Sequence, residues 1–294
     1  MMRKKPMLAY PAGDTPIDYS KPTFIQPKLD GVRCVIQSED VEYHEPYTGK
    51  LIKAQAVKAY SRTGKEWKNI DHILTQLKPF FQKYPNVILD GELYNHDLKN
   101  DFEKIISLVR KTKPTEEDRL ESAQMVQFHC YDIIDEALPF NQRMEFVSQF
   151  LMLFGSSIHI VDTIRVLDEE EARSIHKSNL KKGYEGSIVR TNDTYACKRS
   201  HNLRKFKDFH DTEATITDWV EGKGKRIGTI GKFIARDSEG IEFGMPVMDN
   251  FNKLQDNFED MKTWVGKTAT FTYFERTKAK SYRHPLFKAL RDYE

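Results

Sequence analysis

The spacing of hydrophobic positions predicts several helices in the first two thirds of the chain. Between residues 69 and 83, apolar side chains recur every three or four positions, as on one face of an α-helix. These side chains are Ile70, Ile73, Leu74, Leu77, Phe80 and Phe81. Further helices are predicted over 102–109, over 142–154 and from a capping box of Asp168 and Glu171 to about residue 182.

Segments rich in β-branched and aromatic residues predict strands between these helices. The segments are 23–26, 34–37, 87–94, 125–134, 158–167, 184–190 and 205–209. Residues 23–37 are expected to form a hairpin, with 28–33 at its rim and Gly31 as the turn residue.

After residue 210 the pattern changes to short β-type segments separated by glycine-bearing turns. The segments are 213–219, 227–236, 240–243 and 268–275, with one helical stretch near 250–263. Strands of this length and spacing are typical of a small barrel such as an OB-fold. We therefore predict an α+β chain with two domains, one over 1–209 and a β-barrel over 210–294.

Composition adds limited information about partners and compartment. Residues 181–294 hold 22 Lys and Arg against 17 Asp and Glu, whereas residues 1–180 hold 24 against 27. This asymmetry indicates a partner with phosphates, although a solvated surface has the same composition. The three cysteines form no CxxC pair, which favours a reducing cytosol, and we expect neither a signal peptide nor a transmembrane segment.

The segment Lys28-Leu-Asp-Gly-Val-Arg33 has the form KxDGxR and is the first candidate for chemistry. A lysine amine attacks phosphorus only in its neutral form, so a nucleophilic Lys28 needs a site that favours deprotonation. Taken alone, the segment also describes an exposed hairpin with a lysine, an acidic turn and an arginine.

Further short segments follow in a fixed order. They are Ser61-Arg-Thr-Gly64, Leu89-Asp-Gly-Glu-Leu93, Phe128-His-Cys-Tyr-Asp132, Glu185-Gly-Ser-Ile-Val-Arg190, Lys205-Phe-Lys207, Gly222-Lys-Gly-Lys-Arg226, Tyr273-Phe-Glu-Arg276, Arg283-His-Pro-Leu-Phe287 and Arg291-Asp292. In this order the chain resembles the minimal two-domain ATP-dependent DNA ligases of phages and viruses. The resemblance implies an ATP-grasp-like nucleotidyltransferase domain of antiparallel sheets with helices, followed by an OB-fold domain.

The resemblance also assigns roles to individual residues. Lys28 would be the catalytic residue that carries AMP, and Phe128 would stack on adenine. Contacts to ATP or AMP are expected from Gln26, Lys28, Arg33, Glu92, Phe128, Glu185, Lys205 and Lys207. Glu92 and Glu185 suit a nucleotide-bound Mg²⁺ or Mn²⁺, because such ions take one or two carboxylates together with phosphate oxygens and water. Lys205 and Lys207 share one face of a predicted strand, and a solvated lysine face is the alternative.

Other residues are expected to contact DNA or pyrophosphate. Arg62 would hold the 5′-phosphate of a nick, a task suited to a bidentate guanidinium. Arg283 and Arg291 would orient the pyrophosphate leaving group. The chain reads Arg291-Asp-Tyr-Glu294 where many relatives have a final lysine. Candidates to replace that lysine are Lys278, Lys280 and Lys288.

The function implied is ATP-dependent sealing of 5′-phosphate/3′-hydroxyl nicks in duplex DNA, as in DNA replication, repair or recombination. The protein is expected to act as a monomer, away from membranes. An RNA ligase or an mRNA capping guanylyltransferase is the alternative enzyme. A non-catalytic nick- or end-binding protein is the alternative of another class.

Overall fold

The computed structural model describes residues 4–13, 15–99, 101–151, 154–207, 209–277 and 279–291. The chain divides into two compact units, Met1–Lys207 and Asp208–Glu294. Each unit has its own buried hydrophobic side chains. The predicted boundary after residue 209 and the functions expected of the two domains stay predictions.

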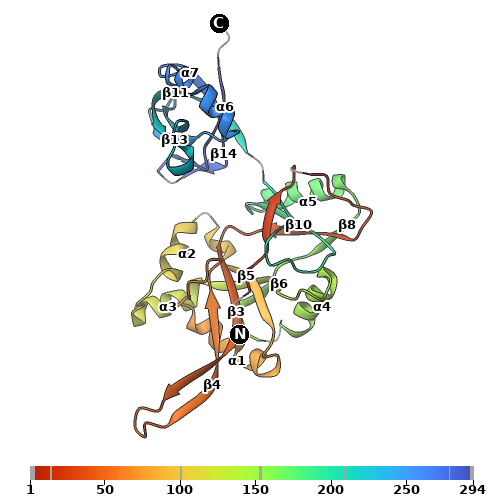
Figure 1. Cartoon of the computed structure of the whole chain (residues 1–294). Coiled ribbons are helices and arrows are strands. Elements are labelled where there is room, and N and C mark those ends of the chain that lie inside the picture. The colour runs from red at the N-terminus through yellow and green to blue at the C-terminus, as the bar shows by residue number, and fades with distance from the viewer. Residues whose placement is uncertain are drawn as a thin grey trace. The chain divides into compact units, whose positions relative to one another are not determined.

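The first unit is built on two five-stranded sheets (Figure 1). Sheet A has the order β1 (Leu8–Pro11), β10 (Arg199–Phe206), β9 (Gly186–Thr191), β2 (Thr23–Lys28) and β8 (Ile164–Val166). Sheet B has the order β4 (Leu51–Tyr60), β3 (Val32–His44), β5 (Ile88–Tyr94), β6 (Gln127–Ile133) and β7 (Ile158–Ile160). Neighbouring strands are antiparallel except for β1 with β10 and β6 with β7.

Four helices and a 3₁₀ turn complete the part of the unit around sheet B. They are α1 (Asp71–Lys83), η1 (His96–Leu98), α2 (Phe102–Val109), α3 (Glu116–Met125) and α4 (Phe140–Phe150). The predicted face of α1 is confirmed, because its apolar side chains are buried against sheet B. The sequence pattern missed α3, whose residues are mostly polar and whose start is fixed by a capping box between Thr115 and Asp118.

Helix α5 (Glu169–Lys181) packs on sheet A through Ala172, which lies among Ile25, Val166 and Val189. The backbone N–H of Glu171 donates to Asp168 Oδ1 at 2.8 Å, so Asp168 is confirmed as the N-cap. The other half of the predicted capping box is not formed, because the Glu171 side chain accepts from the backbone N–H of Leu167, at 2.8 Å, and not from that of Asp168.

The predicted hairpin over 23–37 is wrong, because β2 and β3 belong to different sheets. Strand β2 pairs with β8 and β9, whereas β3 pairs with β4 and β5. A Cβ at Gly31 would lie 2.4 Å from the carbonyl oxygen of Leu93, so glycine allows the linker to pass close over β5. Segment 28–33 therefore connects the two sheets.

Two other strand predictions also need correction. The segment 158–167 forms two strands, β7 in sheet B and β8 in sheet A. The predicted strand 205–209 is the end of a longer strand, β10, that begins at Arg199 and stops at Phe206. In both places the chain changes partners in space, which local composition does not reveal.

The second unit is a small antiparallel barrel, as predicted. Its strand order is β13 (Glu242–Pro246), β12 (Ile230–Arg236), β11 (His210–Glu221), β14 (Thr268–Tyr273) and β17 (Leu286–Leu290). The two outer strands also approach each other, which curls the sheet around Phe233, Met245 and Phe271. The remaining elements are η2 (Gly224–Arg226), α6 (Phe251–Asp256), α7 (Phe258–Lys262), β15 (Glu275–Arg276) and β16 (Tyr282–Arg283).

A buried ionic network ties sheet A to sheet B. Asp132 on β6 is 0% exposed and accepts from Arg143 of α4, Nε to Oδ1 at 2.7 Å and Nη2 to Oδ2 at 3.0 Å. Arg190 on β9 donates from Nη1 to the same carboxylate at 2.7 Å. One buried carboxylate thus balances cations from a helix and from the opposite sheet.

Replacing this carboxylate is expected to destabilise the first unit strongly. The variant Asp132→Ala leaves two buried guanidinium groups without their counter-ion, which should lower the free energy of unfolding by about 3–5 kcal/mol. Urea denaturation followed by circular dichroism measures the change. Glu145→Ala, on the exposed face of α4, is the control and should change stability by less than about 0.5 kcal/mol. Equal effects of the two variants on the free energy of unfolding would contradict the conclusion that this network stabilises the first unit.

Candidate active site

A cavity of about 270 Å³ lies where the linker between β2 and β3 crosses from sheet A to sheet B. Its walls come from both sheets and from the turn after β4. The lining residues are Leu8, Ala9, Gln26, Pro27, Lys28, Leu29, Arg33, Arg62, Glu92, Tyr131, Ile188, Arg190 and Leu203. Five of the residues expected to touch nucleotide or phosphate, namely Gln26, Lys28, Arg33, Arg62 and Glu92, are thus brought together.

Glu185 connects Lys28 to a second lysine. The Lys28 ammonium donates to Glu185 Oε2, and Lys207 Nζ lies 2.5 Å from Glu185 Oε1. Burial alone would raise the pKa of Glu185, but the charges of the two lysines and their hydrogen bonds hold it below its ordinary value. Glu185 therefore remains a carboxylate that holds both cations.

Backbone pairing fixes this carboxylate beside Lys28. The N–H of Glu185 donates to the carbonyl of Lys28 at 3.1 Å, and Lys28 pairs with Gly186 in the ladder between β2 and β9. Gly186 has φ 150, and a Cβ there would lie 2.3 Å from the carbonyl oxygen of Phe206. Only glycine fits this crossing of β9 and β10.

Arg33 is held rigidly at the other side of the cavity. Its Nε donates to Asp90 Oδ1 at 2.6 Å and its Nη2 donates to Asp90 Oδ2 at 2.5 Å. The hydroxyl of Tyr195 donates to the same carboxylate at 2.6 Å. This bidentate pair fixes the plane of the guanidinium, so Arg33 faces the cavity from a preset position.

Glu92 lies opposite Arg33 in the ladder between β3 and β5. Burial raises its pKa to about 7, against the opposing effect of the charges on Arg33 and Lys28. The hydroxyl of Tyr131 donates to Glu92 Oε2 at 3.3 Å. Glu92 is therefore partly protonated at neutral pH, and a cation bound beside it would favour its ionised form.

Glu92 and Glu185 both lie close to Lys28 and fit a nucleotide-bound divalent ion. Among the described residues there is no cluster of three or more His, Cys, Asp or Glu that could hold a metal. A pair of carboxylates that needs phosphate oxygens and water to complete the coordination suits Mg²⁺ or Mn²⁺ better than a metal bound by protein alone.

The expectation that Phe128 stacks on adenine needs correction. Phe128 is 0% exposed, belongs to the hydrophobic core of sheet B and does not line the cavity. Side chains alternate along β6, so Phe128 and Cys130 face the core. Tyr131 lines the cavity instead. The sequence carried a signal for this arrangement. Polar His129 and Tyr131 alternate with apolar Phe128 and Cys130, which indicates that Tyr131 lies on the side of β6 away from the core.

Gln26 lines the cavity with an amide that is already bonded to protein. Its Oε1 accepts from Arg190 Nε at 2.7 Å, and its Nε2 donates to Thr163 Oγ1 at 2.8 Å and to the Tyr131 carbonyl at 3.2 Å. Sequence reasoning assigned no role to Arg190, which joins Gln26 to Asp132. Any contribution of Gln26 to base recognition is therefore a contact from a side chain whose position is fixed by its bonds to protein.

Lys205 lies on β10, two residues after Leu203, which lines the cavity. Side-chain alternation puts both residues on the same face of the strand, with Lys207 following in the same phase. The face predicted for the two lysines is therefore the one that borders the cavity, and Lys207 uses it to reach Glu185.

Arg283 and Arg291 belong to the second unit. Arg283 Nη1 lies 2.6 Å from Glu275 Oε1, and Arg291 Nη2 lies 2.7 Å from Glu213 Oε1. Of the three candidate replacement lysines, Lys288 is paired with Asp211 and Lys280 has φ 59 in the turn between β15 and β16. Lys278 and the ending 292–294 lie outside the described residues. The role of Arg283 and Arg291 in orienting pyrophosphate stays a prediction.

The two sheets with a lysine at the cavity between them, followed by a small barrel, define a nucleotidyltransferase domain joined to an OB-fold. The family model of the ATP dependent DNA ligase domain matches residues 6–207. The chain belongs to this family.

A viral relative agrees with that assignment. A DNA ligase of African swine fever virus (isolate Pig/Kenya/KEN-50/1950) is 30% identical over 218 residues, which are 70% of this chain. The matched part is 46% of the viral protein, so the chain spans about half the length of the curated relatives that it matches.

Two solved structures share the fold over nearly the whole chain. A structure from a study of Lig E DNA ligases, described as binding DNA with a minimal scaffold, has a TM-score of 0.74 at 20% identity and covers 99% of this chain and 100% of its own. The ATP-dependent DNA ligase of bacteriophage T7 in complex with ATP has a TM-score of 0.56 at 18% identity, with 98% of each chain covered.

In the described part of the chain, no helix is long and apolar enough to cross a membrane.

The raised pKa of Glu92 predicts a pH-dependent gain in stability for Glu92→Gln in metal-free buffer. The folded-state pKa of about 7 lies above the ordinary value. The stability that protonated Glu92 contributes is therefore complete in acid and is lost as the pH rises through about 7. Glutamine cannot ionise, so the melting temperature of the variant relative to the native protein should be higher at pH 8 than at pH 5.

Thermal denaturation at the two pH values measures this difference. Glu145→Gln is the control, because Glu145 is exposed and its substitution should give the same shift at both values. A shift for Glu92→Gln that does not change with pH would contradict the buried position of this carboxyl group.

Proposed function

We propose that this chain is an ATP-dependent DNA ligase that seals 5′-phosphate/3′-hydroxyl nicks in duplex DNA, with Lys28 as the residue that becomes adenylated. The observation that carries the proposal is the placement of Lys28, which lines the cavity between the sheets and is held by a carboxylate shared with Lys207. Membership of the DNA ligase domain family supports the chemistry.

In the first step the neutral amine of Lys28 attacks the α-phosphorus of ATP. A nitrogen–phosphorus bond forms, the bond from the α-phosphorus to the bridging oxygen breaks, and pyrophosphate leaves with the electron pair. Glu185 accepts a hydrogen bond from Lys28 and holds Nζ in the cavity, and the proton that Nζ loses passes to water. Lys205, Lys207 and Arg33 offset the negative charge on the phosphates.

A Mg²⁺ or Mn²⁺ ion held by Glu92 and Glu185 would further neutralise charge on the phosphates. Tyr131 presents the aromatic ring in the cavity, and we assign to it the contact with adenine that sequence reasoning gave to Phe128. Gln26, fixed by Arg190 and Thr163, forms the wall beside that ring.

In the second step an oxygen of the 5′-phosphate attacks the phosphorus of the Lys28 adduct, and the nitrogen–phosphorus bond breaks. In the third step the 3′-hydroxyl attacks the 5′-phosphorus and AMP leaves. Arg62, which lines the cavity with an exposed side chain, is assigned to the 5′-phosphate. All three displacements depend on alignment and charge neutralisation rather than on an acid–base triad.

We assign residues 1–209 to the adenylation domain and 210–294 to the OB-fold domain. Arg283 and Arg291 are assigned to pyrophosphate in the first step. The loop with Lys223, Lys225 and Arg226 is assigned to the DNA backbone in the later steps, which requires the barrel to move between steps. The free cysteines, two of them buried, support a reducing cytosol, and we propose that the protein acts there as a monomer.

An RNA ligase and an mRNA capping guanylyltransferase would share the lysine chemistry. ATP and GTP labelled at the α-phosphate distinguish the guanylyltransferase, since a DNA ligase should be labelled by ATP alone. A nicked DNA duplex run beside an RNA-only nick distinguishes the RNA ligase.

Removing the nucleophile should abolish both labelling and sealing. We expect Lys28→Ala to form no adduct with labelled ATP and to leave a nicked duplex unsealed, because among the described residues no other lysine lines this cavity. Lys177→Ala, on the exposed face of α5, should retain both activities. Sealing by Lys28→Ala would show that the nucleophile is misassigned, and an adduct-free native protein would favour the non-catalytic binding protein.

The exchange of roles between Phe128 and Tyr131 gives a second prediction. Tyr131→Leu should raise the KM for ATP about fivefold, which corresponds to the ~1 kcal/mol of one aromatic contact. Tyr131→Phe keeps the ring and should change KM little.

Phe128→Leu should instead lower the free energy of unfolding by about 1–3 kcal/mol and leave KM unchanged, because the residue is core. Adenylation kinetics and urea denaturation measure the two quantities. A raised KM for Phe128→Leu with normal kinetics for Tyr131→Leu would restore the original assignment.

A further inference from the structure

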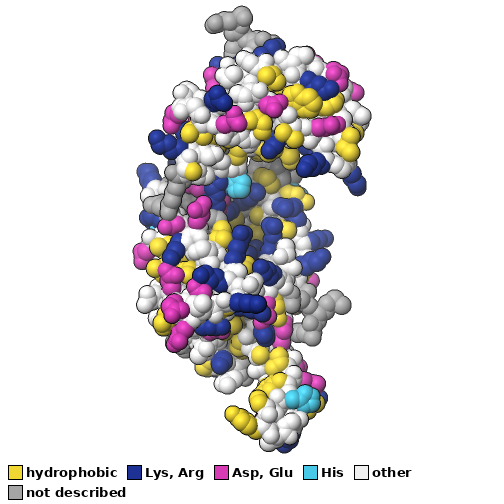
Figure 2. Space-filling view, turned by 90° about the vertical axis from the view of Figure 1, so that its left-hand side faces the viewer, with side chains coloured by type: hydrophobic (Ala, Val, Ile, Leu, Met, Phe, Trp, Pro, Cys, Tyr) yellow, Lys and Arg dark blue, Asp and Glu magenta, His cyan; other side chains and the backbone are white. Residues whose placement is uncertain are grey.

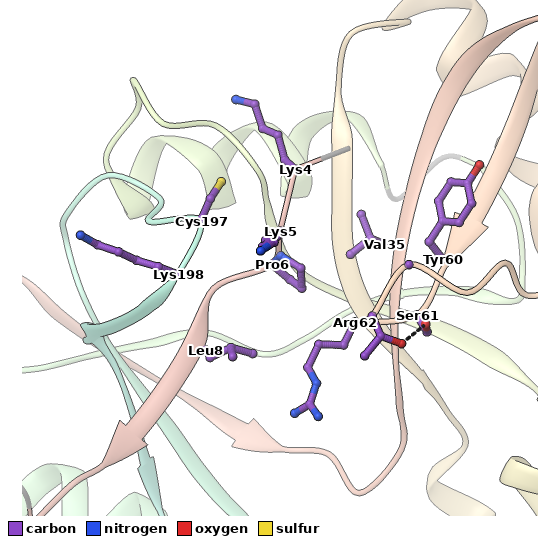
Figure 3. A pocket seen from close by; sticks show the side chains of 12 residues that line it. Lys4, Lys5, Pro6, Leu8, Val35, Tyr60, Ser61, Arg62, Cys197 and Lys198 are labelled. Atoms are coloured by element: carbon purple, nitrogen blue, oxygen red, sulfur yellow. Dashed lines mark hydrogen bonds between the residues drawn. The ribbon is translucent and has the colours of Figure 1, made fainter. Parts of the chain in front are cut away.

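A second cavity of about 460 Å³ adjoins the nucleotide cavity (Figure 3). It lies between the segments that lead into β1 and β10 of sheet A and the strands β3 and β4 of sheet B, with the turn after β4. Its lining residues are Lys4, Lys5, Pro6, Leu8, Val35, Tyr60, Ser61, Arg62, Thr63, Gly64, Cys197 and Lys198. Leu8 and Arg62 line both cavities, so the two cavities adjoin at these residues.

The charged part of this lining is entirely positive. Lys4 is paired with Glu136 at 2.6 Å, whereas no hydrogen bond or ion pair joins the side chains of Lys5, Arg62 or Lys198 to any other described residue. Figure 3 shows Arg62 extending from the turn after β4 toward Leu8, with Lys5 and Lys198 on the opposite wall. Three neighbouring cations without a counter-ion create a positive potential that favours an anion.

The rest of the lining combines apolar side chains with the hydroxyls of Ser61 and Thr63, and it suits a sugar more than a free anion. Pro6, Leu8, Val35 and Tyr60 form the wall next to the cations. The cavity is also larger than the one beside Lys28, about 460 Å³ against about 270 Å³. A chain of alternating phosphates and deoxyribose rings would use both parts of the lining, whereas a pyrophosphate group would contact only the cations.

We propose that this second cavity binds the sugar–phosphate backbone of the DNA strand that carries the 5′-phosphate of the nick, at the second and third phosphates from that end. This inference rests on the proposed ligase function, in which Arg62 holds the 5′-phosphate. Because Arg62 lines both cavities, a strand leaving the reacting phosphate past this residue enters the second cavity. Figure 2 shows Lys and Arg side chains gathered on one face of the first unit, where a duplex backbone would be attracted.

The first test compares Lys5→Ser/Lys198→Ser with the native full-length chain, both adenylated on Lys28 beforehand. Affinity for a nicked duplex, measured by fluorescence anisotropy over a range of salt, should fall about tenfold or more at low salt. The slope of log affinity against log salt should decrease by about 2, one for each lost phosphate contact. Lys78→Ser/Lys177→Ser, on exposed faces of α1 and α5, is the control and should match the native protein.

The second test assigns the strand. Neutral methylphosphonate linkages are placed at the second and third phosphates of the 5′-phosphate strand, or at the two phosphates nearest the end of the 3′-hydroxyl strand. The first duplex should bind the native protein about tenfold more weakly and should show no such loss with Lys5→Ser/Lys198→Ser. Loss only with the second duplex would overturn the choice of strand.

Three further outcomes separate this inference from the proposed function. If Lys5→Ser/Lys198→Ser raises the KM for ATP in adenylation and leaves nick affinity unchanged, the cavity binds the triphosphate tail. If its nick affinity equals that of the control variant, the lysines are a solvated surface and the inference is wrong. If the native protein forms no adduct with ATP, the ligase function itself fails.

Discussion

The carboxylate of Glu185 is the interaction on which the site depends. It lies just before β9 and binds Lys28 at the end of β2 and Lys207 just beyond β10, so one buried anion joins three neighbouring strands of sheet A. Two adjacent ammonium groups would repel each other without it, and a buried carboxylate would be costly without them. The same pair of contacts fixes where the amine of Lys28 can meet a phosphate.

The cavity exists because the chain crosses between two sheets immediately after that lysine. Lys28 ends a strand of sheet A and Arg33 lies in a strand of sheet B, and the close pass of Gly31 over β5 allows the crossing. Behind the cavity, Asp132 joins the sheets through Arg143 and Arg190. The nucleophile and the residues that face it are thus carried by elements that cannot shift independently.

The sequence predicted which residues lie around the cavity more reliably than it predicted the direction of each side chain. Gln26, Lys28, Arg33 and Glu92, to which the resemblance assigned contacts with nucleotide, all line one cavity, and their roles there stay predictions. Strand pairing was missed at residues 23–37, because the hydrogen-bonding partners of β2 and β3 lie far away in the chain and local spacing does not encode them. Phe128 was misassigned because an aromatic residue in a strand is equally compatible with core and cavity until the alternation along β6 is used.

The central claim is that Lys28 is the residue that carries AMP, and mapping the adduct tests it most directly. The native protein is incubated with ATP and a divalent metal, digested, and its peptides are analysed by mass spectrometry with fragmentation. The account predicts AMP on the peptide that contains Lys28, attached to that side chain, and its loss when nicked DNA is added. AMP attached to Lys205, Lys207 or any other lysine, with Lys28 unmodified, would contradict it.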